Sequence, residues 1–152
     1  MHRTSTLVAL FISSLFTTVA SAQTTRTVCA SGCDFTSINA AIDASSNGDV
    51  IQLSAETYSE GSTIDTLGKA ITIIGTVDGN GDPTTILDGG GAVQVLRCID
   101  NFPFFHNGPQ FENLVIQNGF APGGEGGGMY IYSSNPTLTN CMFKNNSAYR
   151  GG

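Results

Sequence analysis

The sequence has few charged residues and no tryptophan. Asp, Glu, Lys and Arg make up 12% of its 152 residues, and six Lys and Arg against twelve Asp and Glu give a formal net charge of −6. Binding to nucleic acid or to anionic lipid needs a cluster of cationic side chains, which this composition does not supply. It therefore argues against nucleic acid as a partner. It also argues against acidic polysaccharide, unless a cation bridges the two.

Long apolar runs are also missing, except for one at the N-terminus. Residues 7–19 are apolar apart from Ser and Thr, His2 and Arg3 precede them, and Ala20-Ser21-Ala22 is an A-x-A cleavage site. The run is short for a membrane anchor. We therefore predict a signal peptide over residues 1–22, a mature chain without a membrane span, and an exported protein that is extracellular or held at the cell surface.

The mature sequence offers little for nucleophilic catalysis. His106 is its only histidine, and no serine occupies a G-x-S-x-G turn. A nucleophile that depends on histidine would thus have a single available base.

Four cysteines follow the predicted cleavage site, and an even number in an exported chain favours disulfides over metal ligation. Cys29 and Cys33 are close enough to form a small local loop. Zinc is the alternative for this pair, although no histidine lies at a matching distance. We predict a Cys29–Cys33 disulfide. The sequence leaves open whether Cys98 and Cys141 bridge neighbouring turns of the chain or are buried thiols.

What the sequence has in abundance is glycine, at 19 positions, set between short β-branched runs. Gly126-Gly127 recurs as Gly151-Gly152, 25 positions later, with two expected strands between them. A fixed period of this length, built of short strands and turn residues, indicates a solenoid. We therefore predict an all-β parallel β-helix. Leu87, Val115 and Met142, at separations of 28 and 27 residues, should occupy equivalent positions in successive coils.

The sequence divides into three parts. After the signal peptide, residues 23–47 should form an N-terminal cap and residues 48–152 the coils. The principal strands are expected at residues 48–53, 70–75, 84–88, 92–99, 111–117 and 137–143. The sequence stops on Gly151-Gly152, where the next strand should begin, so we expect coils that are incomplete at the C-terminal end and a fragment of a longer surface protein.

One helix is expected, over residues 36–44. Thr36 or Ser37 can serve as its N-cap, and Ile38, Ala41 and Ile42 fall on one face at helical spacing. A short amphipathic helix ahead of a solenoid would cover the hydrophobic end of the stack.

Two groups of residues resemble known β-helix proteins. Gly48-Asp49-x-Ile51-x-Leu53, followed by Tyr58-x-Glu60, is similar to the entry segment of the pectin-lyase-like superfamily. Gly126-Gly127-Gly128-Met129 with Phe143-Lys144-Asn145-Asn146 resembles the paired GGAI and FxxN repeat of polymorphic outer-membrane proteins, and departs from GGAI at its third and fourth positions. The resemblance covers roughly residues 34–152 and implies a right-handed β-helix. It does not specify an activity, because the superfamily hosts lyases, hydrolases, esterases and non-catalytic surface proteins.

A lyase of this superfamily would need calcium-binding carboxylates beside an outward Arg or Lys that acts as the base. The candidate base is Arg97, and the candidate acids are Asp78, Asp82, Asp88 and Asp100. An enzyme would require these residues to converge on one face. The acids lie in different turns, and Arg97 is also placed for a simple surface ion pair with Asp100.

Asp78, Asn80 and Asp82 are the candidate metal ligands, since they match the start of a calcium loop. The twelfth position of such a loop should be Glu and is Gly89 here. A polar turn rich in Asn, Asp and Gly is therefore the favoured interpretation.

Four aromatic residues are candidates for contact with carbohydrate or a partner. Phe104 and Phe105 belong to an aromatic insertion that could also pack on the flank of the helix. Tyr130 and Tyr132 alternate with Met129 and Ile131, so the tyrosines should face outward if their neighbours face inward. They would serve equally well as ordinary strand residues.

These observations favour an exported, non-catalytic β-helix that acts as a cell-surface scaffold, adhesion or carbohydrate-contacting module. Its expected partner is a polysaccharide or another surface protein, and it needs no cofactor. The alternative is a pectate-lyase-like polysaccharide lyase or a glycoside hydrolase that works in a groove on the helix, with calcium in the case of the lyase.

Overall fold

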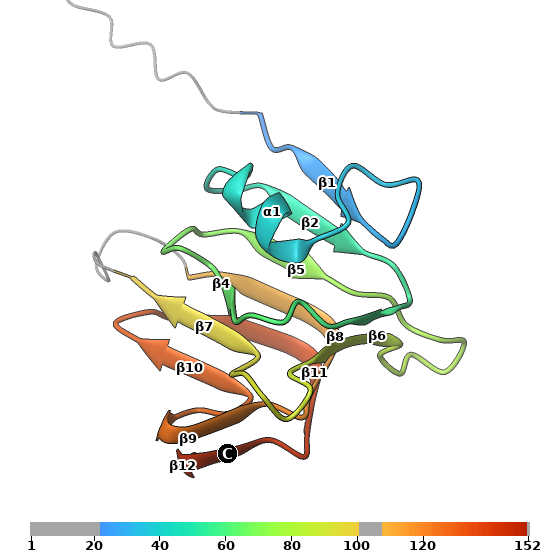
Figure 1. Ribbon diagram of the computed structural model, residues 1–152. Coiled ribbons are helices and arrows are strands. Elements are labelled where there is room, and N and C mark those ends of the chain that lie inside the picture. The colour runs from blue at the N-terminus through green and yellow to red at the C-terminus, as the bar shows by residue number, and fades with distance from the viewer. Residues whose placement is uncertain (1–21, 101–107, 152) are drawn as a thin grey trace, which may run out of the picture.

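The structure is a computed structural model that describes residues 22–100 and 108–151 (Figure 1). It is all-β, with twelve strands and one short helix in the described part of the chain. The elements are β1 Thr25–Val28, α1 Ile38–Asp43, β2 Val50–Leu53, β3 Thr57–Tyr58, β4 Ile64–Asp65, β5 Thr72–Ile74, β6 Thr85–Asp88, β7 Leu96–Ile99, β8 Gln110–Gln117, β9 Phe120–Glu125, β10 Met129–Tyr132, β11 Thr137–Lys144 and β12 Ser147–Arg150. Among these elements no helix has the length and apolar character needed to cross a membrane.

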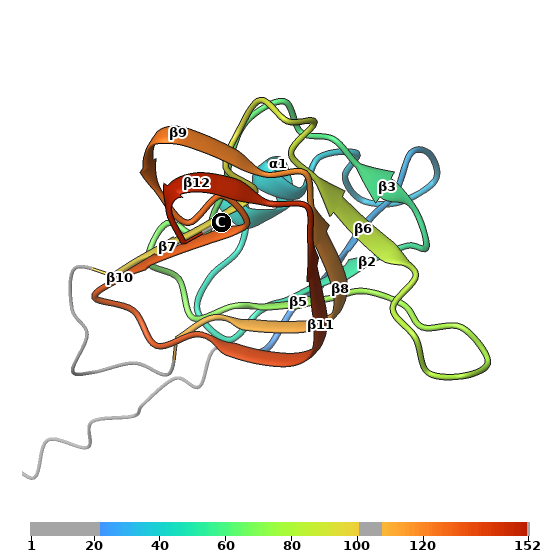
Figure 2. The same ribbon diagram turned by 90° about the horizontal axis from the view of Figure 1, so that it is seen from below.

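The paired strands run parallel and come from successive passes of the chain. The largest sheet has the order β1-β2-β5-β8-β6-β3, with β11 also on β8. A second sheet has the order β10-β7-β4, and β12 pairs with β9. The end-on view of Figure 2 shows these strands surrounding a common interior. Parallel neighbours need a long connection between them, and here each connection contains other elements of the chain.

The long strand β8 turns a corner in its middle. Its first half pairs with β5, its second half pairs with β6, and its full length pairs with β11. Asn113 in β8 and Asn140 in β11 mark this corner with φ angles of 58° and 49°. Asparagine tolerates left-handed angles better than most residues. The Asn140 side chain also donates to Asn113 Oδ1 at 2.9 Å, which locks the two corners together.

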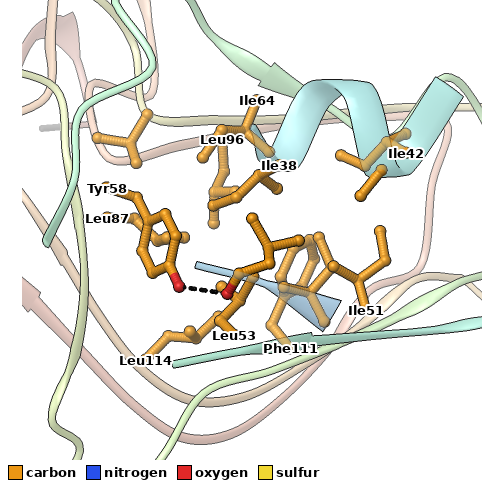
Figure 3. Close-up of a cluster of buried hydrophobic side chains, with 14 of the residues drawn as sticks. Ile38, Ile42, Ile51, Leu53, Tyr58, Ile64, Leu87, Leu96, Phe111 and Leu114 are labelled. Carbon is orange, nitrogen blue, oxygen red and sulfur yellow. Dashed lines mark hydrogen bonds between the residues drawn. The ribbon is translucent and has the colours of Figure 1, made fainter. Parts of the chain in front are cut away.

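Apolar side chains from successive strands meet inside (Figure 3). Ile51, Ile73 and Phe111 are register partners on β2, β5 and β8, and each is fully buried. The hydroxyl of Tyr58 also reaches this interior, where it donates to Val28 O at 2.7 Å. Every second residue of β2, β6 and β7 is buried, and these side chains contribute to one core.

The helix α1 closes the N-terminal end of this core, as predicted. Ser37 is its N-cap, and the Glu60 carboxylate accepts from the Ser37 hydroxyl at 2.6 Å and from the Ile38 N–H at 2.8 Å. Ile38, Ala41 and Ile42 are fully buried. The helix is shorter than expected because Ser37 is in an extended conformation.

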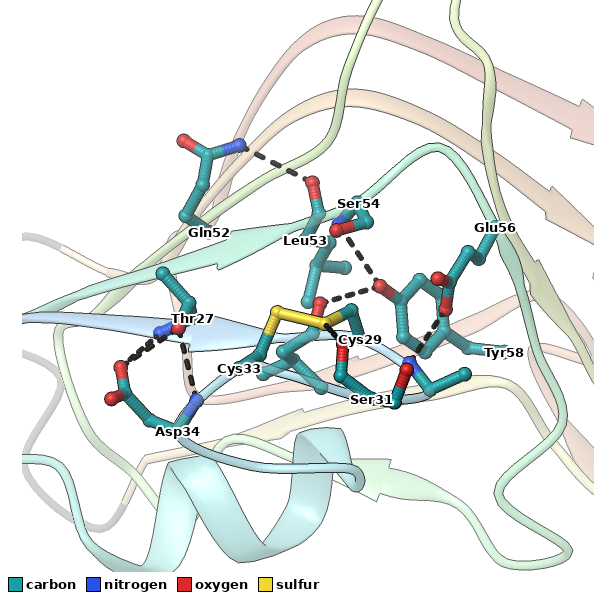
Figure 4. Close-up of a disulfide and its surroundings, with 12 residues drawn as sticks. Thr27, Cys29, Ser31, Cys33, Asp34, Gln52, Leu53, Ser54, Glu56 and Tyr58 are labelled. Atoms are coloured by element: carbon teal, nitrogen blue, oxygen red, sulfur yellow. Dashed lines mark hydrogen bonds between the residues drawn. A yellow bond between two sulfur atoms is a disulfide. The ribbon is translucent and has the colours of Figure 1, made fainter.

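The predicted disulfide between Cys29 and Cys33 is present, just after β1 (Figure 4). It removes the zinc alternative for this pair. Cys98 and Cys141 are both free, so the prediction that left open a second bridge is resolved in favour of two thiols. Burial raises the pKa of the Cys98 thiol to about 12, which keeps it protonated and unreactive.

The predicted strand equivalence is right for one pair and wrong for the other. Val115 and Met142 are register partners, but Leu87 lies opposite Ile116, one residue away from the expected Val115. Leu87 and Ile116 are both fully buried. A shift of one residue moves a side chain to the other face of a strand, so burial decides this register.

Among the strands that were not expected are β9 and β12. The sequence of β9, FAPGGE, contains Pro and Gly, which are disfavoured in strands. Its pairing with β12 has an irregular register between Ala148 and Arg150. Backbone pairing with a neighbouring pass thus prevails over local propensity.

Candidate functional site

A shallow groove of about 510 Å³ lies beside β7 and β10, and we call it the Arg97 groove. Its lining consists of Thr63, Gln94, Arg97, Ile99, Ala121, Gly124, Glu125 and Tyr130. Two of these residues, Arg97 and Tyr130, are candidates from the sequence. The structure therefore brings together a proposed base and a proposed carbohydrate contact that the sequence had assigned to different mechanisms.

Strand register explains how this happens. Asp65, Arg97 and Tyr130 occupy matching positions on β4, β7 and β10. Leu96 and Cys98, on either side of Arg97, are fully buried, so the Arg97 side chain points outward. Tyr130 follows the same alternation, because Met129 packs against the core. Neighbouring strands are about 4.8 Å apart, which places the three outward side chains in a row.

The guanidinium of Arg97 is only loosely paired. Its Nε lies 3.7 Å from Asp65 Oδ2, and the two side chains are 48% and 28% exposed. Asp65 is held in place by the Leu67 N–H, which donates to its Oδ1 at 2.8 Å. A partly exposed ion pair at this distance contributes little to stability. Arg97 has five N–H donors, and the long contact with Asp65 does not occupy them all.

Strand β9 also lines the groove, and Gln94 holds the end of this strand. The Gln94 amide donates to the carbonyl oxygens of Glu125 and Gly126, both at 2.7 Å. The carboxylate of Glu125 lies 3.6 Å from Arg150 Nη1, and both side chains are largely exposed. Strand β9 therefore contributes Glu125 to the lining of the groove that also contains Tyr130.

The glycine repeat noticed in the sequence has a packing role next to this strand. A Cβ on Gly127 would lie 2.3 Å from Ser147 O, and one on Gly119 would lie 2.0 Å from Gly127 O. Both distances are far below van der Waals contact, so the backbones of successive passes approach too closely for any side chain. The motif that resembled GGAI thus positions β9 and β10, and none of its glycines lines the Arg97 groove.

A second groove, of about 630 Å³, surrounds Asp88 at the end of β6. Asp88 Oδ2 accepts from Gln117 Nε2 at 2.8 Å and from Asn118 Nδ2 at 2.9 Å, and the Gly90 N–H donates to Oδ1 at 2.7 Å. Burial alone would raise the pKa of Asp88, but these hydrogen bonds outweigh it and the pKa is lowered. Asp88 is thus a stable carboxylate, and it does not suit the role of a general acid.

The structure does not gather the acids that a lyase would need. Asp78 and Asp82 lie on the loop between β5 and β6, which projects on the side away from β7 and Arg97 (Figures 1 and 2). Asp88 lies in the second groove, and Asp100 follows β7, with its N–H donating to Tyr132 O at 3.3 Å. Within residues 22–100 and 108–151, no three His, Cys, Asp or Glu side chains are grouped so as to hold a metal ion.

The calcium-loop candidates form a polar turn. Asp78 Oδ1 accepts from the N–H groups of Asn80 and Asp82 at 2.8 and 3.0 Å. These bonds, the one from Asp82 first, lower the pKa of Asp78. The carboxylate is therefore used to shape its own loop, as the favoured interpretation of the sequence expected.

The remaining aromatic candidates are placed as follows. Tyr132 is 61% exposed and is the register partner of Ile99, at the border of the Arg97 groove. Phe104 and Phe105, together with His106, lie outside the described residues. Tyr130 is thus the aromatic candidate that lines the groove.

No family model, curated protein or solved structure matches this chain. The site must therefore be judged from its geometry. Sequence reasoning missed Asp65, Gln94 and Glu125, which complete the surroundings of Arg97. The signal that could have found Asp65 is its alternation with Ile64, which predicts an outward side chain but not which residue it meets.

Proposed function

We propose that the protein is an exported, non-catalytic module, wound as a right-handed parallel β-helix, that contacts carbohydrate at a cell surface through the Arg97 groove. The observation that carries this proposal is the side-by-side placement of Arg97 and Tyr130 on the outer face of neighbouring strands. The helical winding is supported by parallel pairing between successive passes. Its hand follows from the strong preference of parallel crossovers for the right-handed connection.

The chemistry of the groove suits a sugar. A tyrosine ring offers a flat apolar face to the C–H groups of a pyranose, and its hydroxyl remains available for a hydrogen bond. The Arg97 guanidinium supplies donors, and Glu125, which lines the same groove, supplies acceptors for hydroxyl groups. A few polar groups around an apolar contact are typical of small-ligand sites.

Hydrolysis and elimination are less well supported. A glycoside hydrolase uses two carboxyl groups that face the scissile bond, and the lining of the Arg97 groove holds one, Glu125. A calcium-dependent lyase would need several carboxylates grouped near Arg97. Asp65 lies 3.7 Å from its Nε, but Asp78 and Asp82 are on a different loop, and no three such side chains are grouped in the described residues. Support for a surface location comes from the predicted signal peptide and the disulfide, which is typical of exported proteins.

The test is binding of the purified chain to a panel of polysaccharides: cellulose, chitin, xylan and polygalacturonate. We expect retention on at least one of them, and a loss of retention in Tyr130→Ala. The matched control is Tyr149→Ala, which removes a tyrosine that is 75% exposed and does not line the groove. Equal retention of the two variants would refute the groove assignment. Release of new reducing ends or unsaturated products by the unaltered chain would refute the non-catalytic assignment.

A further inference from the structure

The charged residues of the Arg97 groove occur in pairs of opposite sign. Among the described residues, the charged members of its lining are Arg97 and Glu125. The Nε atom of Arg97 lies 3.7 Å from Asp65 Oδ2, and Glu125 Oε1 lies 3.6 Å from Arg150 Nη1. Each charge that lines the groove is therefore countered by a neighbour, and the four charges sum to zero.

Asp65 is fixed beside Arg97 by two further hydrogen bonds. Its Oδ1 accepts from the Leu67 N–H at 2.8 Å, and its own N–H donates to Asn39 Oδ1 on α1 at 3.3 Å. Strand β7 lies between β4 and β10, so the pair of Asp65 and Arg97 is inside the stack of strands. One carboxylate oxygen of Asp65 thus serves the turn after β4, and the other faces Arg97.

The other basic residues of the described chain are directed elsewhere. Lys69, which follows β4, donates its Nζ to two carbonyl oxygens at the end of α1, at 2.6 and 3.1 Å. Arg26 lies 2.7 Å from Asp49 Oδ2, and Lys144 is on β11, in a different sheet from β7. Arg97 is thus the cationic group that lines the groove in the described residues, and its charge decides whether an anion is attracted.

A neutral sugar suits this surface better than an acidic one. A sugar hydroxyl both donates and accepts, so it can bind the N–H groups of Arg97 and the carboxylate of Glu125. An unpaired arginine would favour a carboxylate ligand. The carboxylate of a uronate, however, only accepts, and it would bring a negative charge close to Asp65. Selectivity commonly depends on a repulsive element of this kind.

We propose that the Arg97 groove binds a neutral polysaccharide and that Asp65 sets this preference. Asp65 counters the charge of Arg97, while the remaining N–H donors of the guanidinium bind hydroxyl groups. The inference rests on the proposed function, because it concerns the sugar that is bound at the same groove. The ligand class is an uncharged pyranose chain, of the kind found in cellulose, chitin or xylan, and polyuronates are disfavoured. Asp65 acts through Arg97 and is not itself part of the lining.

The first measurement compares neutral and acidic oligosaccharides. The purified chain is titrated calorimetrically, in low salt without calcium, with the galacturonate hexamer and with the hexamers derived from cellulose, chitin and xylan. We expect one neutral hexamer to bind at least about fivefold more tightly than galacturonate. Equal or tighter binding of galacturonate would overturn the inference and leave the proposed function standing. Absence of binding to all four would refute the proposed function, and the inference with it.

The second measurement tests Asp65 itself. Asp65→Asn removes the charge but keeps an oxygen for the Leu67 N–H. It should bind the galacturonate hexamer about fivefold more tightly than the unaltered chain, the factor that corresponds to two unit charges about 4 Å apart in water. The gain should shrink as NaCl is added, because salt screens exposed charges. The matched control is Asp82→Asn, which removes the same charge from the loop between β5 and β6 and should give no gain.

Two more variants separate the charge effect from damage to the fold. Asp65→Ser also removes the charge, and its hydroxyl can still accept from the Leu67 N–H. Circular dichroism establishes that the Asp65 variants keep their strand content. If both bind galacturonate no better than Asp82→Asn, the role of Asp65 is overturned. Adding Arg97→Gln to Asp65→Asn should abolish the gain, and a gain that survives would show that Arg97 is not the group that Asp65 counters.

Discussion

Arg97 of β7 and Tyr130 of β10 are register partners on the outer face of adjacent strands. The 33 positions that separate them in the sequence correspond to one pass around the core. Their neighbours on each strand, Leu96 and Met129, point inward and hold both side chains in this orientation. A cation and an aromatic ring thus reach the same groove because the core beneath them is regular.

A first prediction separates the ring of Tyr130 from its hydroxyl. If the ring stacks on a sugar, Tyr130→Phe should keep the affinity within about twofold, whereas Tyr130→Ala should lose about 1 kcal/mol or more, a factor of ~5. The measurement is calorimetric titration with oligosaccharides of the polysaccharide that the chain retains. A loss in Tyr130→Phe as large as in Tyr130→Ala would assign the contact to the hydroxyl instead.

Parts of the fold could be predicted from the sequence because they depend on nearby residues. The helix with its Ser37 cap follows from local hydrophobic spacing and capping chemistry. The Cys29–Cys33 disulfide follows from short spacing in an exported chain. The polar turn at Asp78 follows from the preference of Asp, Asn and Gly for tight turns. Each of these features is formed by residues that lie only a few positions apart in the sequence.

Other parts depend on contacts between passes and could not be predicted in this way. The loops between strands differ in length, so the spacing of similar segments predicted Leu87 beside Val115, one residue from its true partner Ile116. For the same reason, the sequence did not predict that Asp65 and Arg97 are register partners. The strand β9 was missed because its Pro122 and glycines have low strand propensity, and its pairing with β12 is a tertiary effect.

A second prediction concerns the dependence of stability on pH. The N–H groups of Ser46 and Thr24 donate to Asp49, and together with the Arg26 guanidinium they outweigh burial and lower its pKa. The stabilisation is fully present above the ordinary carboxyl pKa of about 3.9. It is lost as the pH falls from there through the lower pKa of the folded state.

The test variant is Asp49→Asn, which removes the charge but keeps the shape. We expect its destabilisation, measured by urea unfolding, to be larger at pH 7 than at pH 3, because in acid the Asp49 carboxyl of the unfolded chain takes up a proton before that of the folded chain, and part of the native advantage is lost. Asp43→Asn, at an exposed position on α1, serves as the control and should change stability little at either pH. A pH-independent loss in Asp49→Asn would assign its role to geometry rather than charge.

A third prediction concerns the disulfide. Closing a loop as short as that between Cys29 and Cys33 restricts the unfolded chain modestly, and the loop-entropy relation gives about 2 kcal/mol. The double variant Cys29→Ser/Cys33→Ser should lower the free energy of unfolding by about that amount in urea. Reducing agent should produce a similar loss in the unaltered chain and none in the variant. Since Cys98 is buried and protonated, we expect thiol reagents to leave it unmodified in the folded protein.

The last prediction tests the packing of successive passes at Gly127. Its added Cβ would meet the Ser147 backbone at 2.3 Å, a contact that side-chain movement cannot relieve. Gly127→Ala should therefore push β12 away from β9 and destabilise the chain by more than ~2 kcal/mol, as overpacking at a rigid site does. Gly123→Ala is the matched control, because its Cβ would meet no atom within 4 Å. Hydrogen exchange should locate the change. If the backbones approach closely here, Gly127→Ala should exchange faster at residues 147–150, whereas α1 and β2 should be unaffected. Equal stability of the two variants would show that the passes can separate without cost at this position.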